Sequence, residues 1–583
     1  MKKIDPVRLE VLKNAFDAIA DEMALMLMRA AYSPIVRDSM DYSTALCDAK
    51  GQTLAQGVTT PMHLGSFYDA MLHLMEKFAG DIHEGDIFIG NDPYAAAGQH
   101  LPDIYIIEPL FHSGRLVAWA TTIAHHADVG GIVPGSNALG ATEIFQEGLR
   151  LPFLKLQSKG VQNQTIWDII ALNVRVPDLV TGDLRAQMAA CQSCRRSFND
   201  LVARYGIDEV LAYAEELHEY AERLTRAEIA ELPDGDYSFT DHIDGLGETP
   251  EPIIFQVKVS VRGDRILIDF EGSSKQVQGG VNTPLPFTKA SVYTALRSVM
   301  QSDIPNCHGF QRAIEVTAPP GTVVNSVHPA PCGARGITGY RVIDAVFGAL
   351  AGPLPERVTA DGMGGSTVPT FGGWHEGKPF VFTETVMGTW GAGAHHDGQV
   401  GVPHMGANQA NVPIEMIETN YPLRIRRYGT IPDSGGAGRH RGGASFVREY
   451  EFLADEGVLS LRSDKAAFPP HGLAGGHSGR GPLSRLTTPE GSRTLPVLLT
   501  TPVTVRRGDV FCHVSPSGGG YGDPLDRPVA EIVEDLADGI MTPAHAEAVY
   551  GVVMAGGGPD VAATDRRRAD IRAQGAQAQG AQA

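Results

Sequence analysis

The spacing of apolar residues changes several times along this chain, and these changes restrict the fold more than any other feature of the sequence. Apolar residues recur at helical spacing from Leu9 to Met26, and again between Asn163 and Leu232. Asp5 can cap the first of these helices, and Pro6 suits its first turn. From Tyr42 to about Val133, short apolar runs broken by Gly, Pro and Asp are typical of strands. The N-terminal and middle segments are therefore predicted to be helical, with strands between them.

The remainder of the chain alternates between the two patterns and then becomes rich in glycine. Strands are predicted at Ile253–Val261 and Arg265–Phe270, followed by buried helices at Ala290–Met300 and Tyr340–Leu350. Beyond about Gly364, short apolar runs separated by glycines predict further strands. The fold class that follows is a multi-domain α+β chain with mixed sheets and a β-rich C-terminal half.

A chain of 583 residues is too long for one hydrophobic core, so we expect several packed units. The pattern places an N-terminal α/β region at residues 1–235, with its helical segment at 163–232. A mixed α/β domain is expected at 236–363, and a glycine-rich, β-rich domain at 364–555. Residues 556–583 lose periodicity and end in an Ala/Gln/Gly repeat, which predicts a disordered tail.

Charge and cysteine content exclude several classes of protein. The formal net charge of −20 opposes binding to nucleic acid, which depends on clustered Lys and Arg. No apolar run is long enough to span a bilayer, and the N-terminus has no apolar signal region, so we expect no membrane segment and a cytoplasmic location. Six cysteines are too few for a disulfide scaffold, and Cys191 and Cys194 lie in a predicted helix without a second pair. We interpret these two cysteines as helix neighbours.

The segment His100-Leu101-Pro102-Asp103 follows a turn at Gly90–Tyr94. Because Pro102 interrupts an extended stretch, the spacing of three can bring His100 and Asp103 to one metal ion. Taken alone, His100 could equally be a hydrogen-bonded loop histidine, and Asp92 could simply cap the turn.

A second segment favours the interpretation of His100 and Asp103 as metal ligands. The buried strand Ala118–Ala124 ends at His125, His126 and Asp128. Since successive strand residues face opposite sides, only one of the two histidines should share an ion with His100. We favour His125 as that ligand and give His126 or Asp128 an orienting or acid/base role. Mixed imidazole and carboxylate donors predict a catalytic metal site, with Zn²⁺ first and Mn²⁺ or Fe²⁺ as alternatives.

Two other motifs are weaker. His395-His396-Asp397, with His404 nearby, could form a second metal or anion site or a solvent-exposed loop. The glycine runs Gly435–Gly438 and Gly518–Gly522 match neither phosphate-binding loop pattern, and we interpret them as tight turns with positive φ. If ATP is used, another chain should bind it.

These segments resemble the hydantoinase B family, which includes the smaller subunit of ATP-dependent N-methylhydantoinases, the C-terminal part of 5-oxoprolinase, and subunits of acetone and acetophenone carboxylases. The resemblance covers about residues 5 to 555. Its most specific parts are Gly90–Tyr94, His100–Asp103, His125–Gly131, Asn411–Glu415, Asp433–Arg439 and Gly518–Pro524.

The resemblance implies a division of labour between two chains. A hydantoinase A-like partner would bind ATP and Mg²⁺ and phosphorylate a carbonyl or enol oxygen of the substrate, and this chain would complete the reaction. The implied metal ligands are His100, Asp103 and His125. The implied catalytic groups around them are Asp92, His126 and Asp128. The implied assembly is a hetero-oligomer such as a heterotetramer.

The leading functional prediction is an ATP-dependent cyclic amide hydrolase that opens a hydantoin, 5-oxoproline or another lactam. One alternative is a subunit of an ATP-dependent ketone carboxylase that uses bicarbonate. A second alternative is a non-catalytic scaffold whose histidines are structural.

Overall fold

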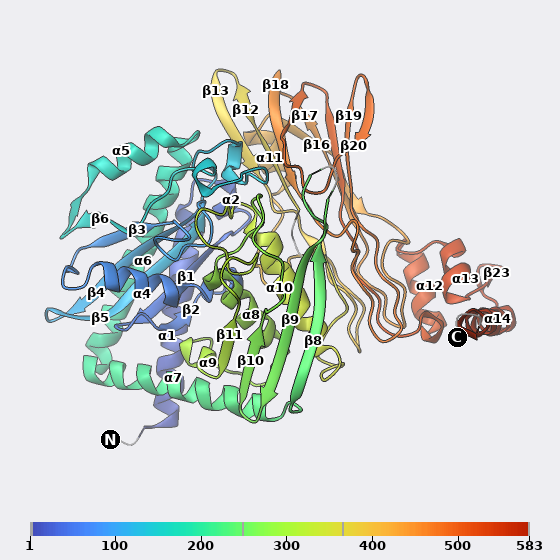
Figure 1. The fold of residues 1–583 in the computed structure, drawn as a ribbon, viewed down its shortest axis with the longest axis horizontal. Coiled ribbons are helices and arrows are strands. Elements are labelled where there is room, and N and C mark those ends of the chain that lie inside the picture. The colour runs from blue at the N-terminus through green and yellow to red at the C-terminus, as the bar shows by residue number, and fades with distance from the viewer. Residues whose placement is uncertain (1–3, 248–249, 364–366, 581–583) are drawn as a thin grey trace.

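The computed structural model describes residues 4–247, 250–363 and 367–580, and it has the predicted multi-domain α+β architecture with several separate sheets (Figure 1). The N-terminal part contains a seven-stranded antiparallel sheet in the order β2-β1-β5-β4-β3-β6-β7. Its strands are β1 (Tyr42–Asp48), β2 (Thr53–Gln56), β3 (Ile87–Gly90), β4 (Asp103–His112), β5 (Arg115–His125), β6 (Leu154–Ser158) and β7 (Val161–Gln162).

Helices cover both faces of this sheet because its central strands are apolar on both sides. In β4, Ile104 and Ile106 belong to the large core under α1 and α6, whereas Tyr105 and Ile107 pack with α4 on the opposite face. The helices of this region are α1 (Pro6–Ala30), α2 (Pro34–Arg37), α3 (Pro61–Leu64), α4 (Phe67–Lys77), α5 (Gln164–Asn173), α6 (Pro177–Tyr205) and α7 (Ile207–Ala230). The predicted N-terminal and middle helices are thus confirmed, and Cys191 and Cys194 are buried free thiols within α6.

The middle of the chain forms a four-stranded sheet in the order β11-β10-β9-β8, packed against α8 and α10. Its elements are β8 (Gly235–Ile243), β9 (Ile253–Arg262), β10 (Arg265–Asp269), α8 (Leu285–Val299), α9 (His308–Gln311), β11 (Ile314–Thr317) and α10 (Arg335–Leu350). Apolar residues of this part and of the N-terminal part form one continuous cluster. The two parts therefore share a core across the boundary expected at residue 235.

The C-terminal half is β-rich, as predicted. A four-stranded sheet has the order β13-β12-β18-β21, and a five-stranded sheet has the order β16-β17-β22-β19-β20. Their strands are β12 (Val368–His375), β13 (Lys378–Thr383), β16 (Leu423–Thr430), β17 (Phe446–Phe452), β18 (Glu456–Arg462), β19 (Leu483–Thr488), β20 (Gly491–Thr494), β21 (Val503–Arg506) and β22 (Val510–Val514). The small elements here are β14 (Gly388–Thr389), β15 (Val400–Val402) and α11 (Ile414–Asn420). Aromatic side chains such as Phe371, Tyr450 and Phe511 fill the core between the two sheets.

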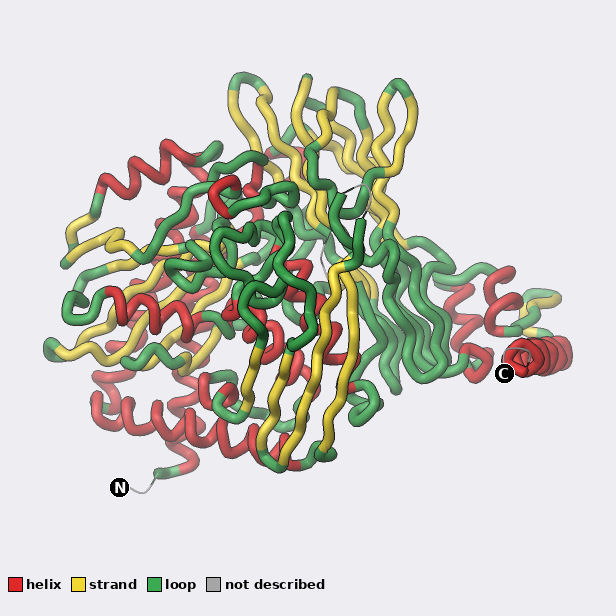
Figure 2. The backbone as a smooth tube through the Cα atoms, in the orientation of Figure 1, coloured by secondary structure: helices red, strands yellow, loops and turns green. Residues whose placement is uncertain are grey.

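Extended loops lie side by side between the five-stranded sheet and the C-terminal helices (Figure 2). They are joined by backbone hydrogen bonds, including Gly436 N to Gly518 O (2.8 Å) and Gly518 N to Gly443 O (2.9 Å). A Cβ on any of these glycines would lie less than 3.0 Å from a neighbouring backbone atom. The prediction of positive-φ turns is wrong for this stack, because of the predicted glycines only Gly522 has positive φ. The glycines are required because backbone packs directly on backbone.

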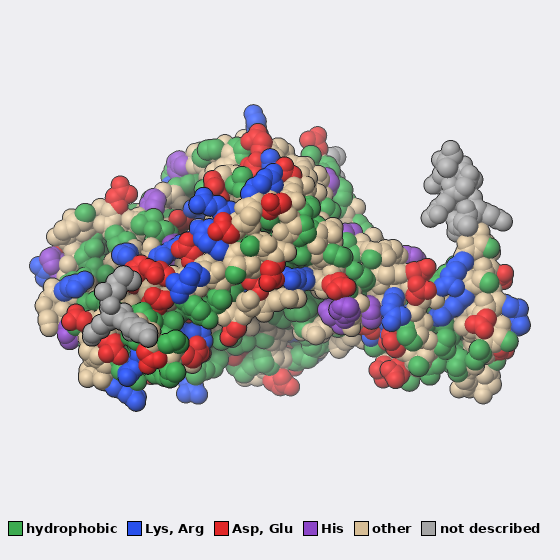
Figure 3. Space-filling view, turned by 90° about the horizontal axis from the view of Figure 1, so that it is seen from below, with side chains coloured by type: hydrophobic (Ala, Val, Ile, Leu, Met, Phe, Trp, Pro, Cys, Tyr) green, Lys and Arg blue, Asp and Glu red, His purple; other side chains and the backbone are tan. Residues whose placement is uncertain are grey.

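The C-terminal helices form a projection from the main body (Figure 3). They are α12 (Val529–Ala537), α13 (Pro543–Tyr550) and α14 (Val561–Gly580), and a short hairpin of β23 (Met554–Ala555) and β24 (Gly558–Pro559) precedes α14. The tail expected from the sequence to be disordered contains α14, whose Ala, Arg and Gln residues are strong helix formers even without an amphipathic pattern. Arg568 anchors this helix by donating to the carbonyl oxygens of Tyr550 and Arg527. Throughout the part of the chain that the structure describes, no helix combines the length and hydrophobicity needed to cross a bilayer.

Candidate metal centre

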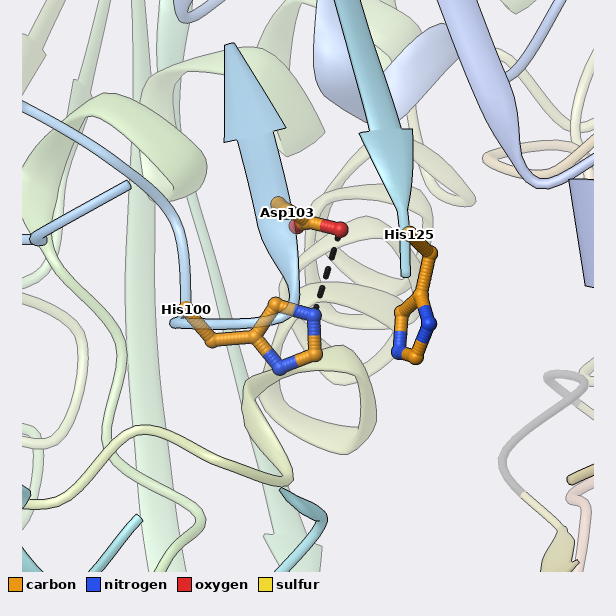
Figure 4. A group of neighbouring side chains, drawn as sticks. All are labelled: His100, Asp103 and His125. Carbon is orange, nitrogen blue, oxygen red and sulfur yellow. Dashed lines mark ion pairs between the residues drawn. The ribbon is translucent and has the colours of Figure 1, made fainter. Parts of the chain in front are cut away.

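Three of the predicted ligands meet where β4 begins and β5 ends (Figure 4). Asp103 and His125 are direct partners across these antiparallel strands, and His100 lies in the loop that leads into β4. One ligand atom from each residue lies within 4.8 Å of the others, and all three side chains are buried. The structure therefore brings together the donor set predicted from the sequence, with His125 rather than His126 in it.

The hydrogen bonds of His100 fix which of its nitrogens can bind a cation. Its Nδ1 donates to the carbonyl oxygen of Gly333 at 2.9 Å, so Nε2 carries the lone pair. That nitrogen lies 3.2 Å from Oδ1 of Asp103. Neither atom has a hydrogen-bond partner within the described residues. Two acceptors that face each other in a buried site fit a metal ion between them, and the chemistry of the donor set suits Zn²⁺.

Burial sets the protonation states that a metal site needs. It lowers the pKa of His100 to about 4, reinforced by the Arg335 guanidinium, and it holds the pKa of His125 well below the usual range. Burial alone would raise the pKa of Asp103, but Arg335, His100 and His63 hold it well below its usual range. At neutral pH the site thus presents two neutral imidazoles and one carboxylate.

Arg335, which the sequence analysis did not identify, fixes the orientation of Asp103. It stands at the start of α10, forms an ion pair with Asp103 Oδ2 and donates to Gln99 Oε1 at 3.0 Å. Its guanidinium lies 4.3 Å from the ring centroid of Phe287. Because Oδ2 is occupied by Arg335, Oδ1 is the oxygen left facing His100.

Asp41 and His63 are further buried residues at this site that the sequence analysis missed. His63 Nε2 lies 3.6 Å from Asp41 Oδ1 and 4.0 Å from Asp103 Oδ1. The backbone of Asp41 accepts a hydrogen bond from His125 N at 3.0 Å. Burial, with Asp103 nearby, raises the pKa of Asp41 to about 7. Asp41 directly precedes β1, the strand that pairs with β5. This position beside a predicted strand is the feature of the sequence that could have indicated its role.

The three predicted catalytic groups have other contacts. Asp92 accepts from the N–H groups of Tyr94 and Ala95 and pairs with Arg150 at 2.5 Å, so it organises a turn. His126 faces the other side of the strand, where its Nε2 lies 3.0 Å from Gln187 Oε1.

Asp128 accepts from Gly130 N, Gly135 N and the backbone and side chain of Arg175. It therefore organises the loop that follows β5. Among the described residues, the side-chain hydrogen bonds and ion pairs of Asp92, His126 and Asp128 go to groups outside the donor set, so this geometry gives their catalytic assignment no support.

The residues of the second histidine motif, His395-His396-Asp397 with His404, do not lie together. His395 and His396 are exposed, whereas Asp397 pairs with Arg527 at 2.7 Å. His404 is buried and its Nε2 lies 3.2 Å from Asp344 Oδ1. Within the described part of the chain, these residues do not form a set of metal ligands.

Similarity to known proteins agrees with the resemblance found in the motifs. The family model described as Hydantoinase B/oxoprolinase matches residues 5–524. The chain is 34% identical to the B-type component of a putative D-/L-hydantoinase from Pseudomonas sp. strain NS671, over 95% of this chain and 96% of the relative. It is 33% identical to the beta chain of the caprolactamase from Pseudomonas jessenii, over 98% of this chain and 100% of the relative.

Two solved structures share the fold. The ATP-dependent caprolactamase from Pseudomonas jessenii matches with a TM-score of 0.89 and 32% identity, over 97% of this chain and 100% of that chain. A nucleotide-free acetone carboxylase matches with a TM-score of 0.90 but 22% identity, over 98% of this chain and 83% of that one, which is a likeness of fold alone. The chain belongs to the hydantoinase B/oxoprolinase family.

Proposed function

We propose that this chain is the metal-containing subunit of an ATP-dependent cyclic amide hydrolase. It completes the ring opening of a hydantoin, oxoproline or other lactam that a hydantoinase A-like partner has phosphorylated with ATP and Mg²⁺. The observation that carries the proposal is a buried pair of acceptors on His100 and Asp103 that have no hydrogen-bond partner among the described residues, with His125 beside them. The similarity to components of a hydantoinase and of a caprolactamase over almost the whole chain supports the substrate class.

The donor set favours Zn²⁺, with Mn²⁺ or Fe²⁺ as alternatives. When bound, such an ion supplies Lewis acidity next to the reacting carbonyl. The protein itself fixes the positions of the ligands: Gly333 orients His100, and Arg335 orients Asp103. Asp41 places another carboxylate at the edge of the same set. Because the set is buried, bulk water is largely excluded from it.

We further propose a hetero-oligomer with the partner, such as a heterotetramer, located in the cytoplasm where ATP is available. All six cysteines are buried free thiols, which is consistent with a reducing compartment.

The test combines the purified chain with its ATP-binding partner, ATP, and a panel of hydantoin, 5-oxoproline and caprolactam. Ring-opened acid, ADP and phosphate should appear, and an Asp103→Asn variant should abolish the product. His83→Ala, at a partly exposed histidine, is the control that should keep activity. No ring opening across the panel would overturn the proposal. Incorporation of labelled bicarbonate into an acidic product would instead assign the chain to the carboxylase alternative.

A further inference from the structure

One buried arginine near the candidate metal centre forms no direct ion pair with any described residue, although the carboxylates of Asp41 and Asp103 lie in its electrostatic surroundings. Arg462 ends β18 and is only 8% exposed. Its Nε and Nη1 atoms have no hydrogen-bond partner among the residues that the structure describes. Other buried arginines are paired: Arg341 Nε lies 2.7 Å from Asp464, and Arg448 Nη2 lies 3.1 Å from Glu384. Burying a guanidinium without a direct partner is costly, and the carboxylates of Asp41 and Asp103 compensate its charge only from a distance, so a bound anion would complete its hydrogen bonds.

The guanidinium of Arg462 lies against the first turn of α10. Its Nη1 and Nη2 atoms are 3.4 and 3.5 Å from the position that a Cβ on Gly336 would occupy. The preceding residue, Arg335, is the one that pairs with Asp103 of the donor set. Arg462 therefore reaches from the C-terminal β-sheets to the rim of the metal centre.

This end of α10 attracts anions for a second reason. The helix runs for 16 residues, and its N-cap residue Ala334 provides no side-chain cap. Arg335 N donates to Cys332 O and Ile337 N donates to Ala334 O, which leaves Gly336 N without an acceptor among the described residues, and the first turn of a helix carries partial positive charge. Burial, with Arg335 nearby, lowers the pKa of Arg462 to about 10, so the guanidinium remains charged at neutral pH. Arg335 pairs with Asp103, whereas Arg462 has donors that meet no acceptor in the described part of the chain and can bind a ligand.

We propose that Arg462 and the first turn of α10 at Gly336 form an oxyanion subsite that holds the phosphoryl group of the activated substrate beside His100, Asp103 and His125. The guanidinium fork and the N–H of Gly336 are separate donors, which suits a tetrahedral oxyanion with several oxygens. The identity of the anion rests on the proposed function, whereas the existence of an anion site rests on the unpaired guanidinium.

The test is calorimetric titration of the full chain with inorganic phosphate, in the presence of EDTA so that a bound metal does not contribute. Wild type should bind phosphate, and Arg462→Gln should weaken binding at least about tenfold, which corresponds to one lost charge-assisted hydrogen bond. Arg462→Lys keeps the charge but loses the forked guanidinium, so its affinity for phosphate should lie between those of wild type and Arg462→Gln. Arg506→Gln, at an exposed arginine of neighbouring β21, should bind like wild type.

Thermal unfolding separates a ligand-binding cation from a structural one. Without phosphate, Arg462→Gln should be as stable as wild type or more stable, because a buried charge without a direct partner has been removed. Arg448→Gln, at a buried and paired arginine, should be clearly less stable. If Arg462→Gln loses as much stability as Arg448→Gln, or if Arg462→Lys binds phosphate as tightly as wild type, the subsite is overturned.

Two further measurements, bicarbonate binding and lactam opening, separate this proposal from the proposed function. If bicarbonate binds to the chain as tightly as phosphate does, the site is not specific for a phosphoryl group. Unchanged phosphate affinity in Arg462→Gln would overturn the subsite even if the complex opens lactams. Phosphate binding that depends on Arg462, in a complex that opens no lactam, would support the anion site and reject the lactamase function.

Discussion

At the scale of single residues, the tautomer of His100 decides what the centre can bind. Since Gly333 takes the Nδ1 proton, the Nε2 lone pair faces the free oxygen of Asp103. We expect Asp103→Ala and His125→Ala each to reduce metal binding to the purified chain by at least about tenfold. Metal content by elemental analysis and affinity by calorimetry are the measurements.

His126→Gln is the matched control for this prediction, because His126 follows His125 directly but faces Gln187 instead of the donor set. It should keep the metal content of wild type. Equal loss of metal in the His126 and His125 variants would contradict the assignment of His125 as the ligand.

Glu147 is a buried acid that holds the loop orienting His100. It accepts from the N–H groups of Cys332 and Gly333, and burial raises its pKa from an ordinary 4.5 to about 8. The folded state therefore holds the proton more tightly than the unfolded state. The stability that this provides is complete below about pH 4.5 and is lost as pH rises through about 8.

Glu147→Gln should remove this pH dependence. Compared with the variant, wild type should lose stability between about pH 5 and 8, by at most about 1.4 kcal/mol per pH unit. Urea unfolding of both proteins at several pH values measures the difference. A difference in unfolding free energy that stays constant with pH would contradict the prediction.

At the scale of elements, the glycine stack is held by backbone contacts that leave no room for a side chain. We expect Gly519→Ala to destabilise the protein by about 1–3 kcal/mol, because its Cβ would lie less than 3.0 Å from the backbone of His471. Gly429→Ala in β16, where a Cβ meets nothing within 4 Å, should change stability little. Thermal unfolding of the two variants makes the comparison, and equal melting temperatures would argue against close packing.

At the scale of the whole molecule, a buried ionic cluster joins the middle domain to the C-terminal half. Lys465 follows Asp464, shortly after the end of β18. It pairs with Asp361 and, at 2.9 Å, with Asp344 of α10, and it donates to the carbonyl oxygen of Gly362 at 2.6 Å. Both carboxylates and the lysine are almost completely buried. The cluster therefore holds α10, and with it Arg335, against the C-terminal sheets.

Lys465→Met should remove the cation nearest to two buried carboxylates, leaving Arg341 at 3.8 and 3.9 Å from them, and should cost about 3–5 kcal/mol of stability. Lys50→Met removes an exposed pair with Glu215 and should cost about 1 kcal/mol or less. Denaturant unfolding of both variants tests the contrast. Similar losses in the two variants would show that burial of the cluster contributes nothing.

The sequence by itself determined the helices, most strands and three members of the donor set. Those features depend on local spacing: periodicity of 3.6 or 2 selects the element, and alternation along β5 separates His125 from His126. Local patterns were misleading in the glycine stack, where close backbone packing and not turn geometry requires the glycines.

Only the tertiary structure decided what surrounds the donor set. Gly333 and Arg335 follow His100 by more than two hundred residues, and Arg462 comes from another sheet. No local pattern marks such residues, because their roles arise from burial and from the partner each one meets after folding. Chain spacing specified which groups could bind a metal, whereas long-range packing fixed their protonation and placed the Arg462 guanidinium beside the first turn of α10.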